Sequence, residues 1–136
     1  MTTREVHLAE PDPGKWVLLE KTGGIRVNTL WEHADTGATI ALLDIPAGAG
    51  VPIRHSHASN QFMYCLEGEY EYLEPRSLVL RPGAFYMNPK DHPHGPTRAR
   101  TRTLVLEIYD GPHYHEIPPY HTAETVGRLS DVSPHG

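Results

Sequence analysis

Two histidines separated by a single residue, His55 and His57, are the part of the sequence best suited to chemistry. Alternate residues of an extended chain project from the same face, with origins about 6–7 Å apart. Imidazoles that converge from such positions can share one divalent ion at roughly 2.1 Å each. The spacing therefore predicts a metal site. Gln61 follows four residues later, and its amide oxygen could be a weak ligand or could hydrogen-bond a bound water.

A second pair, His92 and His94, follows Pro89 on a loop or at the start of a strand. Either histidine could complete a three-histidine site. His92 could instead be a surface or entrance residue, and it could shuttle a proton if it faced the metal. We treat Gln61 and His92 as the candidate catalytic side chains.

The composition agrees with a small metal-binding domain. The chain has 136 residues, which suits one domain, and 10 of them are histidine, the commonest metal ligand. The one cysteine excludes an intramolecular disulfide, and neither a signal peptide nor a stretch long enough to cross a bilayer is visible. We therefore expect a soluble cytoplasmic protein that does not bind membranes.

The charge pattern gives no indication of a nucleic-acid partner. The net charge is −5, and the basic residues are scattered except for Arg98, Arg100 and Arg102. These three alternate along the chain, which predicts the solvated face of a strand. Nucleic-acid binding requires a broader basic patch, so a small molecule is the expected partner.

Short runs rich in strand-forming residues, separated by turns with Gly and Pro, predict an all-β sandwich or barrel. Periodicity does not choose between these architectures. Residues 122–129 are the only candidate for a short helix, and irregular arms are expected over 1–14 and from 110 onwards. The predicted strands are 15–20, 24–32, 38–45, 61–66, 69–73, 77–80, 84–88 and 101–109.

The two histidine segments resemble the paired motifs of the cupin superfamily. The first motif is matched by the segment from Gly50, with its His-x-His pair, Gln61 and Gly68. The second motif is matched by Gly83, Pro89 and His94, with Asp91 where the family has a glycine.

The resemblance implies one cupin domain over residues 1–136, a double-stranded β-helix whose barrel core spans about 38–109. By the same resemblance one divalent ion lies inside the barrel, and His94 rather than His92 is its third histidine ligand. Such barrels often pair through exposed sheet surfaces and exchanged N-terminal strands, so the resemblance also implies a homodimer.

The family usually has a glutamate where this chain has Gln61, so the site is expected to be neutral apart from its metal. Small three-histidine cupins of this kind include iron enzymes that cleave β-diketones and hydroxy-ketones with O₂, and zinc cyclases of polyketide pathways. The expected function is a mononuclear non-haem iron dioxygenase acting on a small enolisable ketone or diketone. A zinc-dependent cyclase or isomerase and a non-catalytic binding protein are the alternatives. Fe²⁺ is the expected ion, with Zn²⁺, Ni²⁺ and Mn²⁺ as alternatives.

Alternation along the predicted strands gives candidates for the substrate pocket. Met63 lies two residues after Gln61 and should share its face. In the strand 84–88, Phe85 and Met87 share one face and the residues between and after them share the other. The sequence does not decide which face is inward, and Phe85 and Met87 are the pair we assign to the pocket.

Two further groups of side chains have open roles. Glu107 is either an exposed strand carboxylate or a pocket acid that meets Arg54 or a substrate. The histidines of the tail, His113, His115 and His121, could form a second metal site, a lid or a dimer contact.

Overall fold

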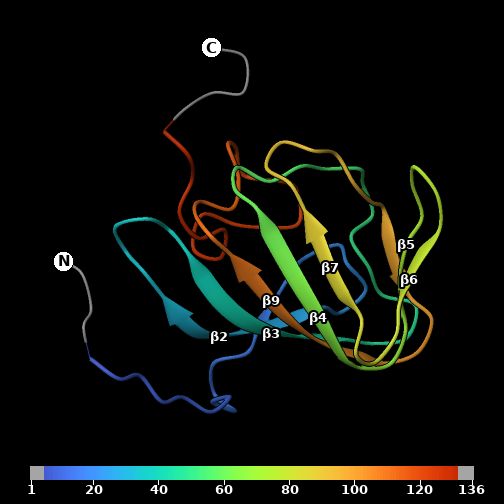
Figure 1. Cartoon of the computed structure of the whole chain (residues 1–136), viewed down its shortest axis with the longest axis horizontal. Coiled ribbons are helices and arrows are strands. Elements are labelled where there is room, and N and C mark those ends of the chain that lie inside the picture. The colour runs from blue at the N-terminus through green and yellow to red at the C-terminus, as the bar shows by residue number, and fades with distance from the viewer. Residues whose placement is uncertain (1–4, 132–136) are drawn as a thin grey trace.

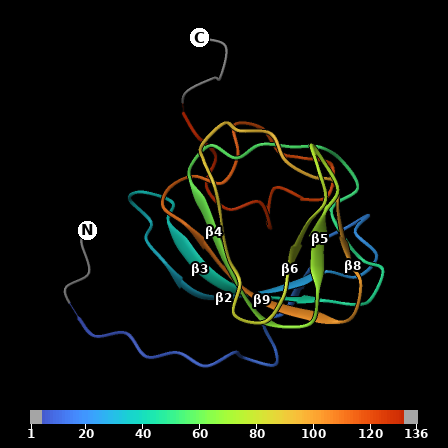
Figure 2. The same ribbon diagram turned by 45° about the vertical axis from the view of Figure 1, so that its right-hand side comes forward.

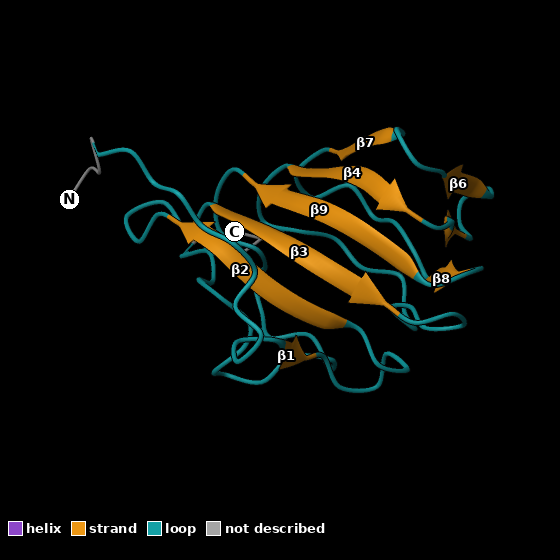
Figure 3. Cartoon of the chain, turned by 90° about the horizontal axis from the view of Figure 1, so that it is seen from below, coloured by secondary structure: helices purple, strands orange, loops and turns teal. Residues whose placement is uncertain are grey.

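The computed structural model describes residues 5–131, which form two antiparallel β-sheets. Figure 2 shows the sheets facing each other around a common interior. The larger sheet has the order β1 (Val17–Leu18), β2 (Arg26–Glu32), β3 (Thr39–Ile45), β9 (Thr103–Tyr109), β4 (Gln61–Glu67) and β7 (Phe85–Asn88), as Figure 3 shows. The smaller sheet has the order β6 (Leu78–Leu80), β5 (Tyr70–Tyr72) and β8 (Thr97–Ala99). The all-β prediction is confirmed.

The core is built by alternate residues of the central strands. On β9, for example, Val105 is fully buried, and on β3 the same holds for Ile45. Burying each such side chain contributes about 1.5–3 kcal/mol to the fold. One face of each central strand therefore packs inside, and the residues that alternate with it face outward.

The core reaches beyond the predicted range of 38–109. Leu19 and Ile25 join it from the N-terminal side, and Tyr114, Tyr120 and Val126 join it from the C-terminal side. The C-terminal arm is irregular as predicted, but it packs against the barrel near the start of β4 and the end of β9 (Figure 1).

Two local predictions need correction. Residues 122–129 form no helix: they make a single turn, in which the amides of Thr125 and Val126 donate to the carbonyl oxygen of Thr122, and Gly127 follows it with a φ of 76°. The short strand β8 was not predicted. Its presence leaves only Arg98 of the three alternating arginines on a strand, although all three are exposed.

No helix within residues 5–131 is long and apolar enough to span a membrane.

Two motif glycines stand where no side chain fits. A Cβ atom on Gly50 would lie 1.9 Å from the carbonyl oxygen of Thr97, and one on Gly68 would lie 2.2 Å from that of Arg102. Gly68 also has a φ of 82°, in the left-handed region that favours glycine. The two glycines therefore allow their segments, which lie before and after the histidine pair, to pack closely against the backbone at Thr97 and Arg102.

Candidate metal centre

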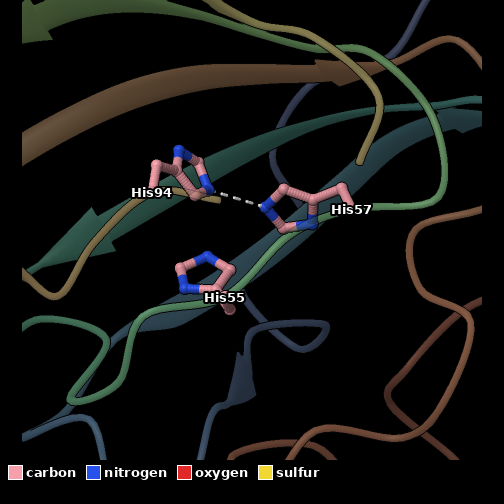
Figure 4. A group of neighbouring side chains, drawn as sticks. All are labelled: His55, His57 and His94. Atoms are coloured by element: carbon pink, nitrogen blue, oxygen red, sulfur yellow. Dashed lines mark hydrogen bonds between the residues drawn. The ribbon is translucent and has the colours of Figure 1, made fainter. Parts of the chain in front are cut away.

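His55, His57 and His94 lie together, with one nitrogen of each within 4.8 Å of the others. The three rings surround a common point in Figure 4. His55 and His57 lie on an extended loop before β4 rather than in a strand. Two backbone hydrogen bonds of 2.8 Å join His55 to His94, so the two motif segments are fixed against each other.

Each of the three imidazoles is held through its Nδ1 atom. The Nδ1 atoms of His55 and His57 lie 3.0 Å and 3.3 Å from the carbonyl oxygens of Ile53 and His113, which can only accept a hydrogen bond. The Nδ1 atom of His94 lies 2.9 Å from the hydroxyl of Tyr86. With the proton on Nδ1, every Nε2 presents a lone pair to the centre. In metal sites, a hydrogen bond at the other ring nitrogen fixes the tautomer of a ligating histidine in the same way.

Burial keeps these imidazoles neutral, which is the form that binds metal. Loss of solvation lowers the pKa of His55, and it lowers the pKa of His94 to about 3. For His57, burial and then the neighbouring imidazoles hold the pKa well below its ordinary value. All three imidazoles are therefore uncharged at neutral pH.

Gln61 is 3% exposed, and its hydrogen bonds fix the orientation of its side-chain amide. Its Nε2 donates to Glu107 Oε2 at 2.7 Å and to the hydroxyl of Tyr109 at 3.2 Å. Gln61 Oε1 is left without a hydrogen-bond partner among the described residues. An unpaired buried oxygen costs about 1–3 kcal/mol, so this atom is suited to a hydrogen-bond donor or a cation. Three neutral imidazoles and a neutral oxygen suit a borderline divalent ion such as Fe²⁺ or Zn²⁺.

Glu107 lies in the interior next to this amide. Burial raises the pKa of Glu107 to about 7, while the hydrogen bonds from Gln61 and Tyr109 act in the opposite direction. The carboxyl group can therefore hold or release a proton near neutral pH.

A cavity of about 210 Å³ adjoins His55, His57 and the Gln61–Glu107 pair. Met63 is part of the lining, and so are five tyrosines: Tyr70, Tyr72, Tyr109, Tyr114 and Tyr120. The cavity is therefore suited to a small, largely apolar ligand.

The assignment of Phe85 and Met87 to this pocket is wrong. Phe85 is 65% exposed and Met87 is 43% exposed, and neither lines the cavity. β7 pairs with β4 in a register that turns Tyr86 and Asn88 inward instead. Tyr86 then supports His94, a role that alternation alone could not assign.

His92 is also placed differently from the catalytic prediction. Its side chain is exposed, and its Nδ1 lies 3.2 Å from Asn88 Oδ1. It lines a second, more open hollow of about 250 Å³ behind His94, together with Arg76 and Tyr86. His92 therefore cannot exchange protons directly with a ligand in the central cavity, and His94 is the histidine that joins the centre.

The C-terminal arm covers the cavity, which agrees with the lid alternative for the tail histidines. His113 and His121 line the cavity, and burial lowers the pKa of each to about 4. His115 is not part of this lining, and its Nε2 lies 2.7 Å from Asp91 Oδ1. Asp91 has a φ of 61°, in the left-handed region that favours glycine, and this accounts for the glycine that the cupin motif has at this position. Aspartate tolerates this conformation better than most other residues. No second group of metal-ligating side chains occurs within residues 5–131.

The tyrosines around the site were not among the predicted site residues. Their one signal in the sequence is composition, with seven tyrosines against two phenylalanines. Buried tyrosine requires a hydrogen-bond partner, so an excess of tyrosine over phenylalanine in a small domain points to a polar interior.

Comparison with known protein families decides the classification. The profile of the ChrR cupin-like domain matches residues 4–113, which is most of the chain. The chain belongs to this family. The predicted cupin fold is confirmed, and this ChrR-type cupin carries a three-histidine cluster at the position that the cupin motifs predict.

Solved structures show the same fold. The acetylacetone dioxygenase of Acinetobacter johnsonii matches 93% of this cupin and 89% of its own chain, with a TM-score of 0.73 and 16% identity. A Methylibium petroleiphilum PM1 protein proposed to be an acetylacetone dioxygenase matches 94% of both chains, with a TM-score of 0.66 and 18% identity.

A third structure has a protein partner. The Rhodobacter sphaeroides complex of SigE with the anti-sigma factor ChrR matches 71% of this cupin and 49% of that chain, with a TM-score of 0.56 and 24% identity. Curated protein sequences give no match to this cupin.

Proposed function

We propose that this cupin is a mononuclear metal-dependent dioxygenase that acts on a small enolisable ketone or diketone. The observation that carries the proposal is the convergence of three neutral imidazoles, each hydrogen-bonded at its Nδ1 atom, beside a small tyrosine-walled cavity that His55 and His57 line. The likeness over nearly the whole chain to the structures of an acetylacetone dioxygenase and of a protein proposed to be one supports it.

Each group of residues has a separate role in the proposed reaction. His55, His57 and His94 would hold Fe²⁺, which when bound supplies open positions for the substrate oxygens and for O₂. Gln61 Oε1, which has no hydrogen-bond partner among the described residues, would supply a neutral oxygen to the ion or accept a hydrogen bond from the ligand. Glu107 is the carboxyl group nearest to Gln61 and can accept the proton that an enolisable carbon loses. Tyr114 and Tyr120, on the arm, exclude water from the cavity.

Oxygen uptake tests the proposal directly. Protein loaded anaerobically with Fe²⁺ should consume O₂ when acetylacetone is added and should cleave the diketone. Protein loaded with Zn²⁺ should bind the diketone and consume no O₂. An absence of O₂ uptake with Fe²⁺ across acetylacetone and simple hydroxy-ketones would contradict the dioxygenase assignment.

A zinc-dependent cyclase or isomerase is the second candidate, and Glu107 favours it. A carboxyl group on the cavity wall can remove a proton and return it, which isomerisation requires and which needs no O₂. Turnover by the Zn²⁺ protein under argon would establish this function. A non-catalytic binding role would instead give tight binding of the ligand without product under either condition.

The apolar outer face of the larger sheet supports a homodimer. One row of cross-strand neighbours on this face is Ile40, Ile108, Phe62 and Met87, and the next is Leu42, Leu106, Tyr64 and Phe85. Eight apolar or aromatic side chains next to one another are unusual on a monomer surface. A second copy of the chain, packed face to face, would cover them.

A further inference from the structure

The lining of the central cavity contains three glutamates and neither lysine nor arginine. Glu107 lies at the inner end, beside Gln61. Glu32, the last residue of β2, and Glu124, on the C-terminal arm, are exposed members of the same lining. Exposed lining residues mark the opening of a cavity, so these two carboxylates flank the mouth.

No cation among residues 5–131 neutralises the carboxylates at the mouth. The ion pairs between described residues include neither Glu32 nor Glu124. The net charge of the whole chain, −5, adds to the negative potential. A ligand that carries a second negative charge would therefore meet repulsion at the mouth and find no basic side chain beyond it.

The tyrosine hydroxyls of the lining do not compensate, because they are bonded to one another and to their neighbours. The hydroxyl of Tyr72 donates to Met63 Sδ at 2.9 Å, and those of Tyr114 and Tyr120 lie 3.0 Å apart. The lining therefore offers few free hydrogen-bond donors to a negatively charged ligand. A bound ion at the three histidines would be the one positive centre of the cavity.

We propose that Glu32 and Glu124 select ligands by charge. The cavity takes small molecules that are uncharged except at the oxygens that reach the histidine centre, and it rejects those with a carboxylate or phosphate elsewhere. This inference rests on the proposed function, because it assumes that a chelating carbonyl ligand occupies the cavity. It makes the two glutamates specificity-determining residues that do not touch the reacting atoms.

The test compares ligands that differ in one charge. The full chain, loaded with Co²⁺ under argon, is titrated with succinylacetone, which carries a carboxylate, and with its uncharged methyl ester, and binding is followed through the visible Co²⁺ spectrum. The ester should bind about tenfold or more tightly than the carboxylate, although it is larger. In the Glu32→Gln/Glu124→Gln double variant the difference should fall to about threefold or less, through tighter binding of the carboxylate. Raising the salt concentration should narrow the difference in the unaltered protein.

Controls separate this proposal from the function on which it rests. Glu116→Gln removes an exposed carboxylate from the same arm outside the lining and should leave both affinities unchanged. Equal binding of acid and ester, or a difference that persists in the double variant, would overturn the charge selection and leave the diketone assignment intact. A Co²⁺ spectrum that responds to neither compound would overturn the diketone assignment and this inference together.

Discussion

The imidazoles of His57 and His94 face each other through their Nε2 atoms at 3.1 Å (Figure 4). With both protons on Nδ1, two lone pairs meet at this distance, and a cation between the rings relieves their repulsion. Without a metal, a hydrogen bond between the two Nε2 atoms requires one ring to take the other tautomer. His94 can do so, because its Nδ1 partner is the hydroxyl of Tyr86, which can donate as well as accept. The Nδ1 atom of His57 lies 3.3 Å from the carbonyl oxygen of His113 and 3.3 Å from the hydroxyl of Tyr109.

Removal of the Tyr86 hydroxyl should therefore weaken metal binding. In Tyr86→Phe, the Nδ1 atom of His94 loses its partner, and both the ring orientation and the tautomer become less defined. We expect the affinity for Zn²⁺ to fall by about 10- to 100-fold, measured by competition with a chromophoric chelator. Tyr64→Phe is the matched control, since Tyr64 is exposed on the outer face. An affinity of Tyr86→Phe within twofold of the unaltered protein's would contradict the supporting role.

Replacement of the neutral amide should change the chemistry and keep the metal. Gln61→Glu introduces an oxygen ligand of the type that the cupin motif usually carries, beside Glu107 at hydrogen-bond distance. We expect one ion per chain to remain and O₂ uptake to fall by about tenfold or more, because the amide no longer donates to Glu107. Metal analysis and oxygen electrode measurements on the same preparation check both parts. Loss of the metal would show that a neutral residue is required there.

The ion pairs at Asp44 should make stability depend on pH. Asp44 accepts hydrogen bonds from Arg26 at 2.7 Å and from Arg102 at 3.0 Å. Burial alone would raise the pKa of Asp44, but the two arginines together lower it below the ordinary value. A carboxylate whose pKa is lower in the folded state stabilises the fold above its unfolded pKa, about 4, and loses this contribution as the pH falls.

Asp44→Asn should therefore lower the free energy of unfolding by about 1–3 kcal/mol at pH 7. The difference from the unaltered protein should shrink towards zero below about pH 3. Urea unfolding at several pH values measures it. A difference that is the same at pH 7 and pH 3 would mean that packing rather than charge explains the effect.

The outer sheet face should hold two copies of the chain together. Phe85 is its most exposed large side chain, at 65%, so Phe85→Glu places a charge within the apolar rows and leaves the barrel interior unchanged. We expect the unaltered protein to sediment as a dimer at micromolar concentration, and the variant as a monomer with a similar unfolding temperature. An unaltered protein that sediments as a monomer would rule out this interface.

The sequence predicted what depends on local pattern. Strand residues with β-branched and aromatic side chains, such as those of β9, were identified, and the spacing of the His-x-His pair anticipated the cluster. The inward face of β7 could not be predicted, because each face carries an aromatic residue, Phe85 on one and Tyr86 on the other, and only the register with β4 decides between them. The roles of His113 and Tyr120 depend on how the irregular arm folds back over the barrel, and a segment without periodicity carries no signal for that.

The most direct test of the three-histidine centre is the metal content of the protein purified without added metal, measured as ions per chain. We expect about one divalent ion in the unaltered protein and in His92→Ala, whose side chain lies outside the centre, and none in His57→Ala. A full complement of metal in His57→Ala would rule out the three-histidine centre. So would an unaltered protein that contains no metal and takes up none on titration with Fe²⁺, Zn²⁺, Ni²⁺ or Mn²⁺.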